Sequence, residues 1–278
     1  MFSTKDYGGD SRNATPRIYH VILILIFQTS GVYGACYQKL QSGGLSCQEK
    51  DSIVTLHNTL RQRVARGSVS GQPPAANMLE MAWDEELARK AQSWADSCPA
   101  GHDSNYARRV GRFHVGQNIA KTWSSSGRSY AESPNFSSQI NAWFSEVYHY
   151  SFGRGGAGHY SQMVWGDSHL VGCGYTQYID GTRNTKMYVC NYGPGGNVVG
   201  KSPYRPGPQS CAQIGATPSR KYSGLCELPG TSSSSCYSSG GSAGYGGYSG
   251  YSSGYSGYSG YSNYYGGYRN RYGRKRRR

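Results

Sequence analysis

Apolar side chains recur every three or four residues in three stretches of the chain, which is the pattern of helices with one buried face. The first stretch follows Ser-Cys-Gln-Glu at positions 46–49, which has the spacing of a capping box, and it ends at Gly67. Its apolar positions are Ile53, Leu56, Leu60 and Val64. We therefore expect a first helix between these two boundaries.

The same periodicity predicts two further helices. Asp84 opens one of them, and Cys98-Pro99 ends it because proline cannot continue a helix. Ser137 or Ser138 would cap the other. Their buried faces consist of Leu87, Ala91, Trp94 and Ala95 in the first case and of Ile140, Trp143, Phe144 and Val147 in the second.

Strand-like segments lie between and after these helices. Residues 112–120 form one such segment, and residues 158–166 run on into the apolar segment 170–175, with a last strand expected over 186–193. The order of helices and strands predicts an α+β domain in which helices cover an antiparallel sheet. If residues 158–166 are a strand, His159 and Ser161 lie on the same face, because side chains alternate along a strand.

The N-terminus predicts export from the cell. Residues 18–27 are an apolar run that follows basic residues and precedes small ones, which is typical of a signal peptide over residues 1–34. All eight cysteines lie beyond this segment, and an even number in a secreted chain indicates disulfide bonds. We expect three pairs, which are Cys173 with Cys190, Cys211 with Cys226, and Cys47 with Cys98.

The C-terminus differs in composition from the rest of the chain. Residues 237–278 repeat Gly, Tyr and Ser, lack large aliphatic side chains and carry seven of the Lys and Arg residues in a chain of net charge +14. Such a segment cannot bury enough apolar area to fold, so we expect a disordered tail. Its basic end would attract anionic glycans or a membrane surface.

Two segments resemble a known family. The sequences GHYSQMVW at 158–165 and YVCNYGPGGN at 188–197 are similar to the two signature segments of the CAP superfamily, in particular to its antigen 5 type. The resemblance covers a core of about 48–200 and implies a CAP domain over 35–200, folded as a three-layer α-β-α sandwich with a central antiparallel sheet. Residues 201–236 would then be a cysteine-containing hinge.

The resemblance also implies a cleft lined by two histidines and two carboxylates. By motif, His102 and His159 match the histidines and Glu146 matches one carboxylate. Gln117 stands where many members carry the second, so this position keeps a hydrogen-bonding group but has no charge. No cofactor is required by this set, although His102 and His159 could hold Zn²⁺ or another divalent ion weakly.

Catalysis is one of the functions that the sequence leaves open. His159, Glu146 and Ser161 resemble a base, its orienting acid and a nucleophile, and a metal-assisted hydrolase is the related alternative. Ser161 lacks the Gly-x-Ser-x-Gly turn of many serine hydrolases, so we expect a protein that is not an enzyme.

The resemblance favours a secreted binding or effector protein of the venom or saliva type. It implies a sterol or fatty acid as ligand, and the glycine-rich residues 153–158 would form a flexible rim for its cleft. A structural or adhesive role through the tail is a further alternative, and no specific nucleic acid is expected as a partner. Asn135 begins the glycosylation sequence Asn-Phe-Ser.

Overall fold

The structure, a computed structural model, describes residue 36 and residues 38–125 and 130–231. The predicted signal peptide, the predicted tail and Cys236 lie outside the described residues. The helices are α2 (Cys47–Ala65), α3 (Glu85–Asp96), α4 (Phe136–Ser145), α5 (Gly158–Met163) and the 3-10 helices η1 (Glu146–His149) and η2 (Cys211–Ile214). The strands are β1 (Gln38–Gly43), β2 (Ala82–Trp83), β3 (Gly116–Ser124), β4 (Leu170–Asp180), β5 (Arg183–Gly193), β6 (Thr217–Pro218) and β7 (Cys226–Glu227).

The central sheet has the order β1-β4-β5-β3, and all of these neighbours are antiparallel, as predicted. The short strand β2 adds to β4 in parallel, with Ala82 opposite Leu170. Strands β6 and β7 form a separate antiparallel pair. Among the described residues, no helix is both long enough and apolar enough to cross a membrane.

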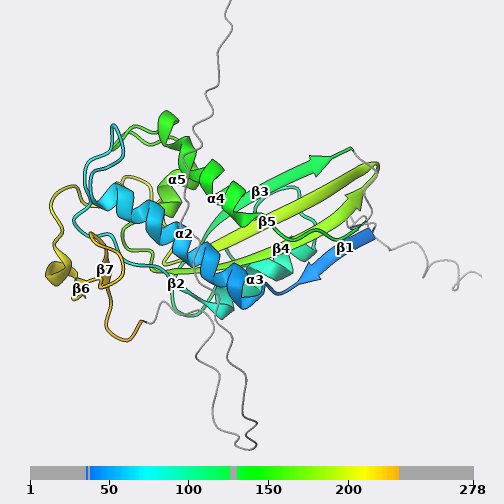
Figure 1. The fold of residues 1–278 in the computed structure, drawn as a ribbon, viewed down its shortest axis with the longest axis horizontal. Coiled ribbons are helices and arrows are strands. Elements are labelled where there is room, and N and C mark those ends of the chain that lie inside the picture. Colours follow the sequence, from blue (N-terminus) through cyan, green and yellow to red (C-terminus); the bar gives the residue numbers. More distant parts are fainter. Residues whose placement is uncertain (1–35, 37, 126–129, 232–278) are drawn as a thin grey trace, which may run out of the picture. The chain divides into compact units, whose positions relative to one another are not determined.

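Helices cover both faces of the sheet, which gives the expected α-β-α sandwich (Figure 1). Helix α3 lies on one face, where Ala91 and Ala95 pack against Met187 and Val189 of β5. Helices α2, α4 and α5 lie on the other face and bury the alternate side chains of β4 and β5. Gly172 and Gly174 of β4 let α3 approach closely, because the backbone of α3 occupies the space that their side chains would need.

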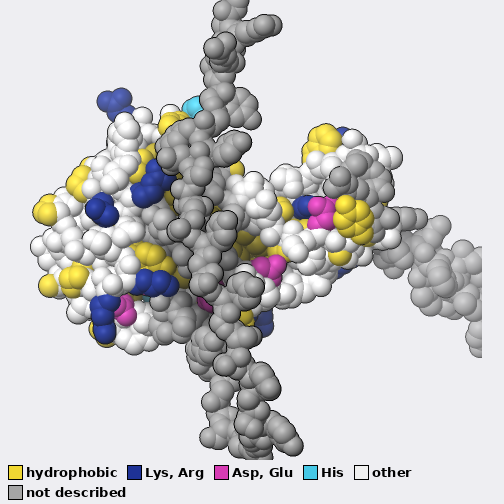
Figure 2. Space-filling model, viewed as in Figure 1, with side chains coloured by type: hydrophobic (Ala, Val, Ile, Leu, Met, Phe, Trp, Pro, Cys, Tyr) yellow, Lys and Arg dark blue, Asp and Glu magenta, His cyan; other side chains and the backbone are white. Residues whose placement is uncertain are grey.

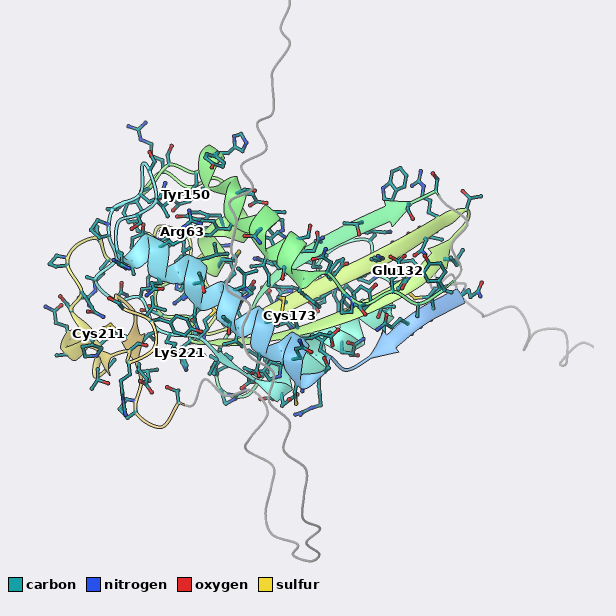
Figure 3. All side chains as sticks on the ribbon, in the orientation of Figure 1. Arg63, Glu132, Tyr150, Cys173, Cys211 and Lys221 are labelled. Atoms are coloured by element: carbon teal, nitrogen blue, oxygen red, sulfur yellow. A yellow bond between two sulfur atoms is a disulfide. The ribbon has the colours of Figure 1, made fainter. Side chains whose placement is uncertain are left out.

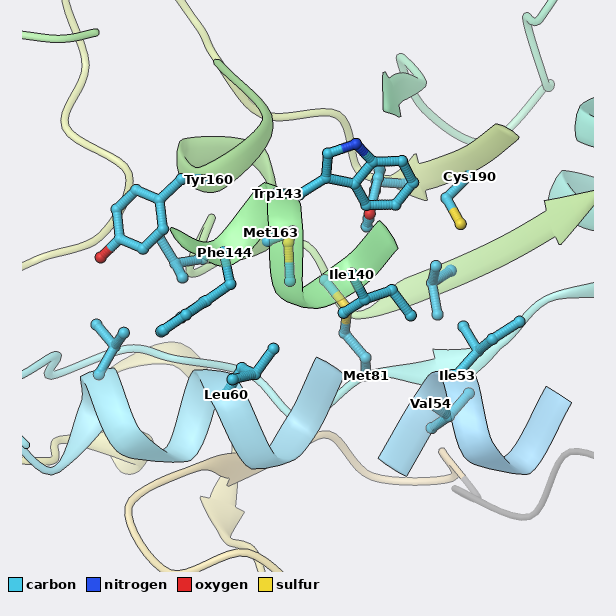
Figure 4. Packing of buried hydrophobic residues seen from close by; sticks show 14 of the residues in the cluster. Ile53, Val54, Leu60, Met81, Ile140, Trp143, Phe144, Tyr160, Met163 and Cys190 are labelled. Atoms are coloured by element: carbon cyan, nitrogen blue, oxygen red, sulfur yellow. The ribbon is translucent and has the colours of Figure 1, made fainter. Parts of the chain in front are cut away.

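The larger core lies between α2, α4 and the sheet. Figure 4 shows Leu60 and Ile53 of α2 on the side of the helix that faces Phe144 and Ile140 of α4, with Tyr160 of α5 beside Phe144. Tyr160 is fully buried, and its ring contacts the rings of Phe144 and Tyr150. Burial of these large side chains is the main contribution to the stability of this layer.

The predicted starts of α2 and α3 are confirmed. Ser46 and Glu49 form the reciprocal hydrogen bonds of a capping box, and Asp84 accepts a bond from the backbone N–H of Leu87. Helix α4 begins two or three residues earlier than predicted, because Asn135 rather than Ser137 or Ser138 provides the cap, by accepting from the N–H of Ser138.

Two of the strand predictions need correction. The strand predicted over 112–120 runs from Gly116 to Ser124. The segment that begins the GHYSQMVW motif is the helix α5, not a strand. Tyr160, Met163 and Val164 are buried, and their spacing of three and four residues is the helical signal that the strand interpretation missed.

Two of the three predicted disulfide pairs are present, between Cys173 and Cys190 and between Cys211 and Cys226. The third prediction is wrong, because Cys98 is bonded to Cys36 rather than to Cys47. Cys47 also forms a disulfide. The strand β1 follows directly after Cys36 and lies at the edge of the sheet, so this bond ties the N-terminal strand to the end of α3.

Candidate functional site

His102 lies beside the start of β3, where Gln117 orients it. Its Nδ1 is 2.9 Å from Oε1 of Gln117, and Nε2 of Gln117 donates to Oδ1 of Asn191 at 3.1 Å. Because the amide nitrogen of Gln117 already donates to Asn191, its oxygen accepts from His102. The neutral ring therefore carries its proton on Nδ1 and leaves a lone pair on Nε2.

His159 is oriented in the same way by Glu146. Its Nδ1 is 2.7 Å from Oε1 of Glu146, and the indole of Trp143 stacks on the imidazole with ring centroids 5.9 Å apart. The second carboxylate oxygen of Glu146 accepts from the backbone N–H of Tyr160 at 3.4 Å. About a third of each side chain of this pair is exposed, so the pair is accessible to solvent.

Neighbouring residues of β3 connect both histidines to the sheet. Gln117 bonds to His102, and Nδ2 of Asn118 donates to the backbone carbonyl of His159 at 3.1 Å. Gln117 and Asn118 point to opposite faces of the strand, as successive residues do. Within the described residues, no hydrogen bond joins the side chains of the two histidines. A single cleft shared by all four residues therefore stays a prediction.

The two histidines offer a metal ion a limited set of ligands. When neutral, both rings would present a lone pair on Nε2, and each ring is held by a hydrogen bond through its other nitrogen, as is common for metal-binding histidines. However, the described residues contain no group of three or more His, Cys, Asp or Glu side chains able to hold a metal. Two imidazoles are too few for a structural zinc site, which takes four protein ligands, and joint binding of an ion by His102 and His159 stays a prediction.

Ser161 is not placed to act with His159. Its hydroxyl donates to Oδ1 of Asn197 at 2.7 Å and lies 3.1 Å from the carbonyl oxygen of Ala157. In a helix, residues two positions apart point in nearly opposite directions. The expectation that His159 and Ser161 share a face is therefore wrong, and the structure does not assemble Ser161, His159 and Glu146 into a triad.

A cavity of about 810 Å³ opens between α2 and α4. Arg63 of α2, residues 68–72, Phe144 of α4, Tyr148 of η1 and residues 150–152 line it. Arg63 and Tyr150 lie on the same side of the molecule (Figure 3). The size of the cavity and its mixture of aromatic side chains with a few polar groups are typical of small-molecule sites.

One polar atom behind the wall of this cavity lacks a partner. Gln72 is 8 % exposed, and although its Nε2 donates to the carbonyl of Tyr150 at 3.4 Å, its Oε1 has no hydrogen bond. A buried acceptor without a donor destabilises a protein, so such an atom points to a missing partner. Gln72 could not be predicted from the sequence, because a glutamine in the loop after a helix carries no signal of its own.

The other histidines that the structure describes are either buried in the fold or exposed. His114 and His149 are exposed, and burial lowers the pKa of His169. His57 is fully buried, where it contacts the backbone carbonyl of Ile53 and the hydroxyl of Tyr192 at 2.8 and 3.0 Å.

Asn135 is exposed at the cap of α4, and its glycosylation stays a prediction.

Because His57 is buried, we expect the free energy of unfolding to fall in acid. Burial lowers its pKa from 6.5 to about 4, so the folded state keeps the ring neutral while the unfolded chain binds a proton. The stabilisation is complete above pH 6.5 and falls as the pH drops toward 4, by roughly 3 kcal/mol in total. Urea unfolding measured across this range should show a flatter pH dependence for His57→Gln. Equal slopes for the two proteins would contradict the assignment.

Comparison with known families places the chain among cysteine-rich secretory proteins. Residues 54–192 match the family described as "CAP: Cysteine-rich secretory protein family". Venom allergen 5.02 of Dolichovespula maculata is 41 % identical over 174 residues, which are 58 % of this chain and 78 % of the allergen. Salivary antigen-5 of Dipetalogaster maximus is 37 % identical in an alignment 211 residues long that covers 67 % of this chain and 83 % of that protein.

Solved structures share the fold. The crystal structure of Na-ASP-1 is 30 % identical with a TM-score of 0.55, and the match covers 67 % of this chain and 48 % of that longer chain. The crystal structure of NaASP2 with Zn²⁺ is 28 % identical with a TM-score of 0.53, covering 67 % of this chain and 98 % of NaASP2. Zinc is therefore known in a protein of the same fold.

Proposed function

The chain belongs to the cysteine-rich secretory protein (CAP) family, and on this premise we propose that it is a secreted antigen 5-like protein that binds a small amphipathic lipid without transforming it. Its relatives from venom and saliva support secretion, as do the disulfide bonds. The cavity between α2 and α4 is the binding site in this proposal.

The observation that carries the proposal is the buried oxygen of Gln72 that lacks a donor. A lipid with one hydroxyl group would place its apolar body among Phe144 and Tyr148. Oε1 of Gln72 is shielded from solvent, so in this proposal the side chain turns toward the cavity on binding and its oxygen accepts the hydroxyl hydrogen of the lipid. An ionised fatty acid has no hydrogen to donate, although its carboxylate could meet Arg63 at the cavity wall. Gln72 therefore favours a sterol over a fatty acid as the ligand.

Catalysis is not part of the proposal. The hydroxyl of Ser161 is directed to Asn197 rather than to His159, so the nucleophile that a serine hydrolase needs is absent from the His159–Glu146 pair. A metal-assisted reaction would need an ion held by His102 and His159, and we expect any such ion to be held weakly. An adhesive role through the tail concerns residues outside the described part of the chain.

We expect Gln72→Leu to weaken sterol binding about tenfold, because the hydroxyl would enter the cavity without an acceptor. Titration with dehydroergosterol, a fluorescent sterol, measures this change in the full chain. Binding of cis-parinaric acid, a fluorescent fatty acid, should change little in the same variant. Gln62→Leu, on α2 but away from the cavity lining, is the control. Unchanged sterol affinity in Gln72→Leu would refute the assignment of Gln72.

A further inference from the structure

A second cavity, of about 490 Å³, lies at a different place from the proposed lipid site. One wall is the glycine-rich loop 153–158, and the other is the segment 197–203. Ser161 and Trp165 also line it. The loop is the one that the sequence predicts to be a flexible cleft rim.

Asn197 ties the two walls together. Its Nδ2 donates to the carbonyl of Gly158 at 2.8 Å, and its Oδ1 accepts from the hydroxyl of Ser161 at 2.7 Å. Asn197 has a φ of 55°, a left-handed conformation that asparagine tolerates better than most residues. These bonds give the segment after Asn197 a defined position relative to the loop, so the surface is prepared before any ligand arrives.

The charge around this cavity is positive and unpaired. Arg154 and Lys201 line it, and of the described residues that line it none is Asp or Glu. Neither cationic group forms an ion pair or a side-chain hydrogen bond with any residue that the structure describes. Lys and Arg side chains are spread over the face of the molecule that Figure 2 shows, so overall basicity does not mark a binding site. Arg154 and Lys201 are more informative, because they line one cavity and have no acidic residue beside them in its described lining.

Exposed apolar side chains stand next to these cations. Val199 is 98 % exposed and Val198 is 43 % exposed, and the turn that carries them is closed by the bond from the N–H of Lys201 to the carbonyl of Val198 at 3.0 Å. A soluble anion would gain nothing from the two valines. A membrane offers both an apolar layer for Val198 and Val199 and, just outside it, anionic groups for Arg154 and Lys201.

We propose that the segment 197–203 and the loop 153–158 form a docking surface for a bilayer that contains anionic phospholipid. Val198 and Val199 enter the outer leaflet, and Arg154 and Lys201 bind the headgroup phosphates that surround them. The basic tail could add a general attraction, but it does not supply the apolar contact. Tyr150 lines both this cavity and the one between α2 and α4, so the docked membrane would lie beside the proposed lipid site.

Partition of the full chain onto vesicles tests the proposal. The vesicles contain phosphatidylserine mixed with phosphatidylcholine, and pure phosphatidylcholine vesicles measure the anionic requirement. We expect Arg154→Gln/Lys201→Gln to reduce the partition coefficient about tenfold or more. Val198→Ser/Val199→Ser keeps every charge, and we expect it to reduce partition roughly tenfold through the lost apolar contact. Both pairs are on the surface, and circular dichroism checks that each variant is folded.

The matched control is Lys39→Gln/Arg220→Gln, which removes two exposed cations that do not line the cavity. The proposal predicts that this control keeps most of the wild-type partition. An equal loss in the control would mean that general charge drives binding, and the docking surface would be abandoned. Membrane docking is refuted if Val198→Ser/Val199→Ser binds vesicles like the wild type and soluble inositol hexaphosphate competes with the vesicles. The cavity would then be a site for free anions. The vesicle result is independent of sterol binding, so either proposal can fail alone.

Discussion

Replacing Arg61 by methionine is expected to lower the free energy of unfolding by about 3–5 kcal/mol. Arg61 lies near the C-terminal end of α2 and is fully buried, and its guanidinium donates to the backbone carbonyls of Leu79, Met163 and Ser168 at 2.6–3.0 Å. It also bonds to the carbonyl of Trp165 at 2.9 Å. Methionine fills similar space but leaves these buried oxygens without donors.

The cation is thus held mainly by backbone dipoles rather than by a carboxylate in contact with it. Burial lowers the pKa of Arg61, which reflects the cost of removing the charge from water, and the nearby charge of Asp167 offsets part of that cost. Arg61 fixes the segment from Met163 to Ser168, which directly follows α5 and its histidine. We therefore expect the variant to disturb the site as well as the core.

Urea unfolding of the disulfide-bonded chain, followed by tryptophan fluorescence, measures this loss of stability. Arg66→Met is a control from the end of the same helix, where the side chain is exposed, and it should change stability by less than about 0.5 kcal/mol. Arg61→Lys keeps the charge but lacks the forked geometry, so an intermediate loss is expected. A loss below about 1 kcal/mol for Arg61→Met would contradict this role.

Gly172→Ala should be the second severe substitution, with a loss of about 3 kcal/mol or failure to fold. A methyl group at Gly172 would lie 2.5 Å from the carbonyl oxygen of Asp84 and 2.8 Å from the carbonyl carbon of Leu87. These are backbone atoms of the first turn of α3, so no side-chain rotation relieves the clash. Helix α3 must instead move away from the sheet, which opens the smaller core.

Gly44→Ala is the matched control for this substitution. Gly44 has an ordinary backbone conformation, and a methyl group there would meet no atom within 4 Å. We expect its unfolding midpoint in urea to stay close to that of the wild type. If Gly172→Ala unfolds at the same urea concentration as Gly44→Ala, the close approach of α3 to β4 does not contribute to stability as described.

The elements that the sequence predicted well are those whose local signals agree with their surroundings. Helix α2 has a capping box and a regular apolar face, and α3 has an aspartate cap, so both starts were predicted correctly. Helix α5 is only six residues long, and in so short a segment the periods of a helix and a strand are hard to distinguish. Tyr160 of α5 packs against Phe144 and Tyr150, and these contacts favour the helix over a strand. The local sequence does not reveal such contacts.

Some residues of the candidate site could be predicted from the sequence and others could not. Motif resemblance identified His102, Gln117, Glu146 and His159, and the structure pairs them as His102 with Gln117 and His159 with Glu146. Arg61 and Gln72 are important because of groups from distant parts of the chain. These groups are the backbone carbonyls that Arg61 bonds to and the residues that line the cavity beside Gln72. A charged residue among the apolar positions of α2 was the available signal for Arg61, whereas Gln72 could be recognised only from its unpaired oxygen.

The most direct test of the proposed function is native mass spectrometry of the full chain after secretion from cells supplied with both sterol and fatty acid. The account predicts that each wild-type chain carries one added mass equal to that of a sterol, and that Gln72→Leu loses most of it while Gln62→Leu retains it. Recovery of the wild-type chain without any added sterol mass, with sterol available throughout, would contradict sterol binding.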